Sequence, residues 1–256
     1  MHFTTAEITA WLGAFMWPFL RIGAMLLAAP LFSARTVTVR IRLGFALILA
    51  MIVAPLLPTP PAVEPLSMAG LTIAVQQVLI GLMIGFVLQM VFSALTQAGE
   101  TIALSMGLGF ASMVDPQGAQ VPVVSTFFLI VSTLLFLALN GHVALIELTL
   151  MSFQTMPIGV EGITRVDLWS LVNWGSTMFA YALLVALPAV AAMLVVNVAM
   201  GVVTRAAPQL NIFAVGFPMM ILLGFILILL SLPALLPQFT EFLALAFGLM
   251  GQFIGR

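Results

Sequence analysis

The feature that most constrains this chain is a series of apolar runs long enough to cross a lipid bilayer. A helix rises about 1.5 Å per residue, so roughly 20 apolar residues cross about 30 Å of hydrocarbon. The sequence therefore predicts an all-α membrane protein with six or seven long apolar helices or helical hairpins. The runs cover residues 8–31, 43–57, 68–96, 123–139 with a possible extension to 150, 171–203, 212–232 and 235–254.

Prolines and run lengths leave the number of spans open. The run at residues 43–57 is short for a full crossing, and Pro188 predicts a kink in the fifth run. Pro233 and Pro237 are expected to break the helix before the last run. That last run then either spans the membrane or lies against the other helices.

Composition supports the membrane assignment and excludes several functions. Hydrophobic residues make up 63% of the chain and charged residues only 6%, against about 25% charged in ordinary soluble domains. Lipid or partner proteins must therefore cover most of the surface, and we expect one domain over residues 1–256 with no soluble domain. A net charge of -1 and the absence of lysine argue against binding nucleic acid.

No pattern in the sequence points to catalysis. There is no cysteine, and neither a GxSxG nor an HExxH motif is present. His142 and Glu147 are too isolated to form a metal site, which needs several converging ligands. We therefore expect no enzyme activity, no cofactor and no metal.

Residues 97–122, QAGETIALSMGLGFASMVDPQGAQVP, form the most unusual segment, because they are rich in glycine and methionine and lie between strongly apolar runs. Non-helical backbone at membrane depth must be buried in protein or line a water-filled space. Residues 99–122 could therefore form a plug-like loop, although an interfacial loop with glycine turns fits equally well. Asp115 and Pro116 suit the start of a turn or helix better than catalysis.

Several polar side chains fall within the apolar runs, where each needs a partner. An unpaired guanidinium at Arg21 would be costly, so we expect it to anchor one helix to another. Gln76, Gln77 and Gln89 can hydrogen-bond across helix contacts, and a pore lining is the alternative. Glu100 could pair with Asp115 in a proton relay, but capping and hydrogen bonding explain both acids more simply.

Four stretches of the chain carry a family resemblance. They are RIGAMLLAAPLFSARTVTVRIRLGFAL, AGETIALSMGLGFASMVDPQGAQVPV, LFLALNGHVALI and TRAAPQLNIFAVGFPMMILLGFILILLSLP. Through them the chain resembles the FliR family of flagellar export-gate proteins nearly end to end. The resemblance implies a subunit of the flagellar type III export gate, in the bacterial inner membrane at the flagellar basal body. Unfolded flagellar proteins would pass through this gate during flagellum assembly.

The resemblance also implies partners and a plug. One copy would assemble with several copies of FliP and FliQ into a cone-shaped helical gate, partly above the bilayer plane, with FlhB and FlhA nearby and lipid around it. The family's plug maps onto the segment described above. Its residues here would be Met106, Gly107, Gly109, Phe110, Met113, Val114, Asp115 and Pro116.

Two rival functions follow from the same residues. An injectisome export-gate homologue would share the fold, although the APQLNIFAVGFP stretch looks more flagellar. A small-solute transporter using Arg21, Glu100 and Asp115 would require internal repeats, and none is visible.

Overall fold

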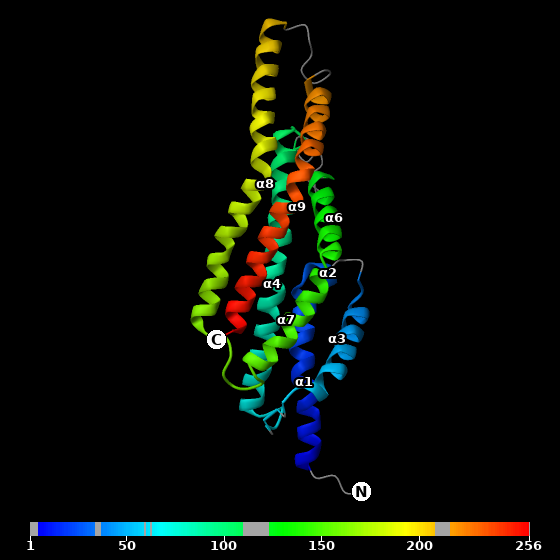
Figure 1. Cartoon of the computed structure of the whole chain (residues 1–256), viewed down its shortest axis with the longest axis vertical. Helices are drawn as coiled ribbons and strands as arrows, with labels where there is room; N and C mark the ends of the chain where they lie inside the picture. The colour runs from blue at the N-terminus through cyan, green and yellow to red at the C-terminus, as the bar shows by residue number, and fades with distance from the viewer. Residues whose placement is uncertain are drawn as a thin grey trace. The chain divides into compact units, whose positions relative to one another are not determined.

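The chain was analysed as a computed structural model that describes residues 5–33, 37–58, 60–61, 63–109, 123–207 and 216–255, with backbone alone for residues 5–10. These parts are helical and contain no strand, which confirms the prediction of an all-α fold. In chain order the elements are α1 (Thr5–Ala28), α2 (Pro30–Ser33), α3 (Val39–Val53), the 3-10 helix η1 (Ala54–Leu56), α4 (Met68–Ser105), α6 (Val123–Ala138), α7 (Gly141–Thr155), α8 (Arg165–Ala206) and α9 (Phe217–Ile254) (Figure 1).

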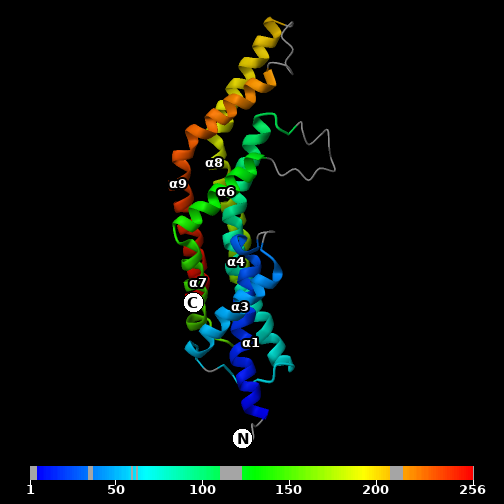
Figure 2. The ribbon, with the colours of Figure 1, turned by 90° about the vertical axis from the view of Figure 1, so that its right-hand side faces the viewer.

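The chain divides into two compact units, and the long helices α4, α8 and α9 contribute residues to both. Unit 1 comprises Met1–Met90, Leu137–Gly175 and Ala244–Arg256, and therefore contains α1, α2, α3 and α7. Unit 2 comprises Val91–Phe136 and Ser176–Leu243, and therefore contains most of α6 with parts of the three long helices. Figures 1 and 2 show the helices of each unit.

Five helical stretches in the described residues are long and apolar enough to cross a membrane, and the bent pair of α6 and α7 can count as a sixth. In the described residues the sixth and seventh predicted runs form one span, because α9 is one helix of 38 residues that runs through Pro233 and Pro237. The expected break at these prolines is therefore wrong. A proline removes one backbone donor, and membrane helices tolerate this loss where neighbouring helices and local adjustments compensate.

Asn140 separates α6 from α7 and is the one non-glycine residue with positive φ in the described part of the chain, at 55°. Asparagine adopts this left-handed conformation more readily than most residues. The fourth apolar run consequently forms two helices, with the second extending to Thr155, beyond the expected end at residue 150.

Helix α4 continues nine residues past the predicted end at residue 96, so residues 99–105 are helical and do not belong to a loop. The glycine at position 99 serves close packing here. A Cβ on Gly99 would lie 2.9 Å from the Cα of Ser125 in α6. Small residues at such contacts let helix backbones approach closely in membrane proteins.

Helix α8 begins at Arg165, earlier than the predicted residue 171, because a capping box starts it. The backbone N–H of Thr164 donates to Oδ2 of Asp167 at 2.9 Å, and the Thr164 hydroxyl donates to the same oxygen at 2.6 Å. These bonds satisfy donors that would otherwise be unpaired at the helix start.

Within unit 1, α1 and α4 pack with almost no space between their backbones. A Cβ on Gly81 of α4 would lie 2.1 Å from the carbonyl oxygen of Arg21, and one on Gly85 would lie 2.6 Å from the Cβ of Ala28. Gly81 and Gly85 are four residues apart, the spacing of the small-xxx-small packing motif of membrane helices. The glycines of the third apolar run therefore allow α1 to pack closely against α4.

Candidate functional site

Arg21 lies fully buried in unit 1 and joins three helices. Its Nε donates to Oε1 of Gln77 in α4 at 2.9 Å. Its Nη1 donates to the carbonyl and hydroxyl oxygens of Ser152 at 2.8 and 3.0 Å, and its Nη2 donates to the carbonyl of Met156 at 2.9 Å. A planar guanidinium can satisfy several acceptors at once in this way.

The charge of Arg21 is stabilised by neutral groups. Ser152 and Met156 lie in the last turn and at the C-cap of α7, where unpaired carbonyls and the helix dipole favour a cation. The Phe153 ring centroid lies 4.1 Å from the guanidinium carbon, which adds a cation–π contact. Arg21 therefore links α1, α4 and the carboxyl end of α7.

The neighbouring glutamine of α4 holds a different segment. Oε1 of Gln76 accepts a hydrogen bond from the backbone N–H of Ile163 at 3.1 Å, just before α8. A Cβ on Gly162 would lie 2.6 Å from the same oxygen, so glycine leaves room for this bond. Gln76 and Gln77 thus hold two different segments of unit 1 against α4, the residues before α8 and α1.

The carboxyl end of α4, in unit 2, is anchored by α8 and α9. Asn197 of α8 donates from Nδ2 to the carbonyl of Ser105 at 3.2 Å. Met106 is fully buried, and a Cβ on Gly224 of α9 would lie 2.5 Å from its Cγ. Gly107 has φ of 83°, in the left-handed region that glycine adopts most easily. The chain therefore turns out of α4 at a fixed point.

Other predicted site residues lie elsewhere or outside the described residues. Gln89 and Glu100 are half-buried on α4 and are not among the partners of Arg21. Gly109 ends the described part of the segment. The rest of the predicted plug, Phe110, Met113, Val114, Asp115 and Pro116, falls outside the described residues.

Asn197 and Gly224 were missed by sequence reasoning. Both lie more than 90 residues from the segment that they anchor, and each is an ordinary polar or small residue in an apolar helix. Only the packing of α4, α8 and α9 within unit 2 brings them to Ser105 and Met106.

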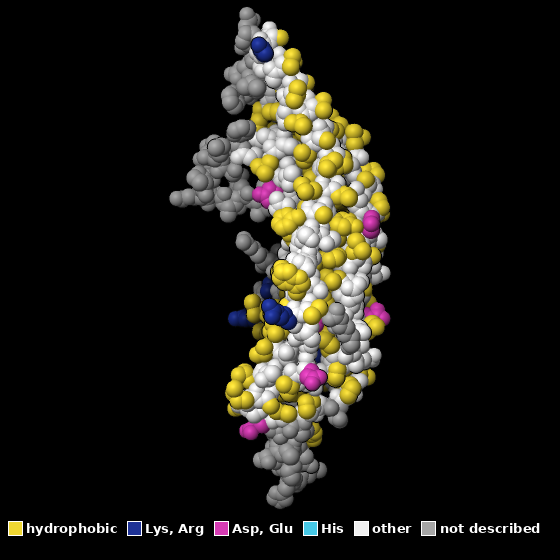
Figure 3. Space-filling view, turned by 90° about the vertical axis from the view of Figure 1, so that its left-hand side faces the viewer, with side chains coloured by type: hydrophobic (Ala, Val, Ile, Leu, Met, Phe, Trp, Pro, Cys, Tyr) yellow, Lys and Arg dark blue, Asp and Glu magenta, His cyan; other side chains and the backbone are white. Residues whose placement is uncertain are grey.

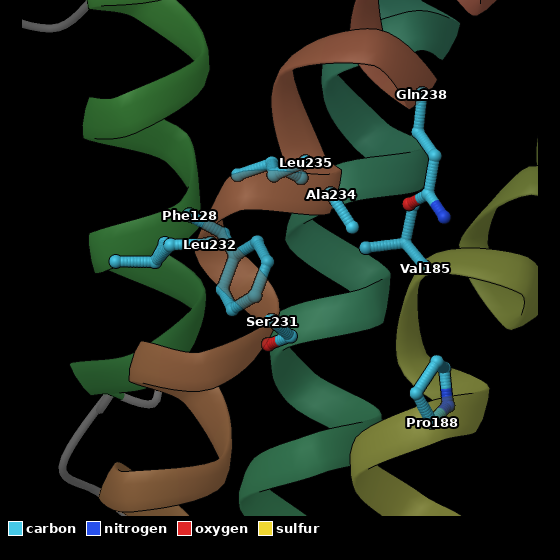
Figure 4. A pocket seen from close by; sticks show the side chains of 8 residues that line it. All are labelled: Phe128, Val185, Pro188, Ser231, Leu232, Ala234, Leu235 and Gln238. Carbon is cyan, nitrogen blue, oxygen red and sulfur yellow. The ribbon is translucent and has the colours of Figure 1, made fainter.

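Unit 2 also contains a small cavity between α6, α8 and α9 (Figure 4). Phe128 lies beside Ser231, Val185 lies opposite Ala234, and the Gln238 amide lies at the other end. Its volume is about 20 Å³, which holds roughly one water molecule and no larger solute. Elsewhere in the described residues, no group of three or more histidine, aspartate or glutamate side chains is placed to bind a metal.

These features define a helical membrane protein whose buried polar groups tie helices together and hold the start of a glycine- and methionine-rich segment. The chain belongs to family 1 of the bacterial export proteins, whose family model matches residues 12–246.

Relatives named flagellar biosynthetic protein FliR match nearly the whole chain. The protein from Escherichia coli strain K12 is 38% identical over 257 residues, which cover 100% of this chain and 98% of that protein. The one from Pectobacterium carotovorum is 39% identical and covers 95% and 93% of the two chains. The one from Bacillus subtilis is 33% identical, with coverage of 84% and 85%. The chain is therefore a component of the flagellar type III export apparatus, and it works with other proteins of that apparatus.

Proposed function

We propose that this chain forms part of the wall and the seal of the channel through which unfolded flagellar proteins leave the cytoplasm. It acts as a structural subunit without catalysis, in the bacterial inner membrane at the flagellar basal body. One copy assembles with FliP and FliQ, and FlhB and FlhA lie nearby. This assignment rests on membership of the export family and on the anchored end of α4.

The anchored turn after α4 is the observation that best supports the seal. Met106 is buried, Gly107 sets the turn, and Asn197 fixes the last helical carbonyl. Met106 and Gly107 are the first of the predicted plug residues, so the segment starts from a fixed point. Methionine and glycine make a deformable seal, because neither residue locks its shape and apolar side chains exclude water.

The apolar surface supports assembly with partner proteins. Helix α8 has 42 residues, about 63 Å at roughly 1.5 Å per residue, against a hydrocarbon layer of about 30 Å. Exposed apolar side chains occur along it, from Val166 to Val203. Figure 3 shows hydrophobic side chains scattered over one face, with separate acidic and basic groups between them. If α8 stands upright in the bilayer, the length outside the hydrocarbon needs protein to cover it.

The geometry of Arg21 argues against the rival solute transporter. Its side chain is fully buried, and Gln77, Ser152 and Met156 accept hydrogen bonds from all three of its nitrogens. A solute-binding arginine needs free donors facing an accessible site. The flagellar names of the relatives likewise favour a flagellar gate over an injectisome gate.

Deleting residues 107–115 tests the seal. We expect the assembled complex to form at its normal level, because the contacts of Ser105 and Met106 with α8 and α9 remain. We expect its membrane vesicles to become permeable to small ions. The assay is ion flux across vesicles, with Gly248→Ala as a control because a Cβ there meets no atom within 4 Å. An assembled deletion complex that stays ion-tight would contradict the proposal.

A further inference from the structure

Helix α9 presents a single charged side chain to its surroundings. Glu241 is the only charged residue among the 38 residues of α9, and its side chain is exposed. The exposed residues one turn away, Pro237 and Leu245, are apolar. An ionised carboxylate on such a surface is costly in contact with lipid and normally pairs with another group.

The hydrogen bond between Tyr181 and Glu241, both in unit 2, leaves most acceptor positions of the carboxylate unused. The Tyr181 side chain of α8 hydrogen-bonds the carboxylate. The Tyr181 ring stacks on the buried Phe242 with centroids 4.2 Å apart and planes 7° apart, so the hydroxyl is held in position. A carboxylate accepts about four hydrogen bonds, and one tyrosine supplies one. The exposed side of Glu241 can therefore bind an external donor.

The charges on the other apolar helices indicate whether that external donor carries a positive charge. Side chains at Glu100 of α4 and Glu147 of α7 are also acidic and lie inside apolar helices, at least partly exposed. The basic side chains instead lie near helix ends, with Arg40 and Arg42 in the first turn of α3 and Arg165 and Arg205 in the first and last turns of α8, and Arg21 is buried. Within the described helices, the exposed charges away from helix ends are thus negative, which a basic partner would complement.

We propose that Glu241, oriented by Tyr181, binds a lysine or arginine side chain on an apolar helix of a neighbouring protein of the export apparatus. This inference rests on the proposed function only in that the chain works inside an assembly. The apolar residues around Glu241 pack against the partner helix, and the ion pair fixes the depth at which the two helices meet. A charge pair shielded from water is specific as well as attractive, because a wrong register leaves both charges unpaired.

The test measures how much of the full chain is recovered together with a tagged partner from cells that express the whole export gate, and compares this amount between variants. Glu241→Gln keeps the hydrogen bond to Tyr181 and removes the charge, while Glu241→Lys opposes the basic partner. We expect recovery to fall several-fold for the first and about ten-fold or more for the second, since like charges at an interface are strongly unfavourable. Glu161→Lys is the matched control, because Glu161 is exposed outside the helices.

Charge exchange completes the test. In cells that carry Glu241→Lys, each lysine or arginine in the partners' apolar helices is changed in turn to glutamate. At one position this second change should restore recovery of Glu241→Lys to at least half of the wild-type level. Equal recovery of wild type and Glu241→Lys would overturn the inference and indicate that Glu241 faces water or lipid headgroups. Restoration at no position would also overturn it. A wild-type chain that is never recovered with partners would contradict the proposed function itself.

Discussion

At the scale of single residues, the polar side chains of the apolar helices act as connectors. Arg21 uses all three nitrogens on neutral acceptors from two other helices. The sequence could predict that Arg21 needs a partner, because an unpaired charge is costly in an apolar setting. It could not identify Ser152 and Met156, because their carbonyls carry no sequence signal and lie more than 130 residues away.

Replacing Arg21 should therefore lower the stability of unit 1 by more than the loss of a single hydrogen bond would. Arg21→Met removes the charge and leaves Oε1 of Gln77 and the half-buried carbonyl of Met156 without their donor, at a cost of about 1–3 kcal/mol for each orphaned group. The Ser152 carbonyl still accepts a hydrogen bond from the backbone N–H of Met156. Arg21→Lys keeps the charge but lacks the planar fork of the guanidinium, so its stability should lie between that of the wild type and that of Arg21→Met. Thermal unfolding in detergent measures the order, and equal stability of all three proteins would contradict this role.

Gly224 provides a test of how the end of α4 is held. Gly224→Ala places a Cβ 2.5 Å from the Cγ of Met106, so that side chain must move. We expect a small loss of stability, because methionine is flexible, together with increased protease cleavage after the end of α4. Gly248→Ala on the same helix meets no atom within 4 Å and is the matched control. Identical cleavage of both variants would show that Met106 does not fix the turn.

At the scale of helices, the sequence predicted the helical class and most positions, but not several helix ends. Each apolar run overlaps a helix, and residues 68–96 and 171–203 lie wholly inside α4 and α8, because periodicity and length are properties of the local sequence. Pro233 and Pro237 were misleading, since whether a proline ends a helix depends on what packs around it. Gly99 was also misleading, because it lies within a helix, where it allows close contact with α6, and does not form a turn.

The glycines of α4 allow a direct test of the contact between α1 and α4. Gly81→Ala places a Cβ 2.1 Å from the backbone carbonyl oxygen of Arg21, and a backbone atom cannot move aside cheaply. We expect a loss of about 1–3 kcal/mol, typical of overpacking, and a lower yield of folded protein. Gly44→Ala in α3 meets nothing within 4 Å and should be neutral or slightly stabilising. A Gly81→Ala protein as stable as Gly44→Ala would contradict this packing.

At the scale of the whole molecule, the composition requires something besides water to cover the chain. Hydrophobic residues form 63% of the sequence, and large apolar side chains are exposed on nearly every described helix. The same apolar signal arises whether lipid or protein lies against a helix, so the sequence could not tell these environments apart. Helix lengths beyond the thickness of the bilayer favour protein cover for part of the surface.

The central claim is that this chain functions as one subunit of a channel assembly. Native mass spectrometry of the chain expressed with FliP and FliQ tests it most directly, because subunit composition is read from the mass of each particle. We expect a single defined particle that contains one copy of this chain and several copies of the partners. A stable solitary monomer or homodimer, with the partners present and folded, would contradict the claim and revive the solute-transporter alternative.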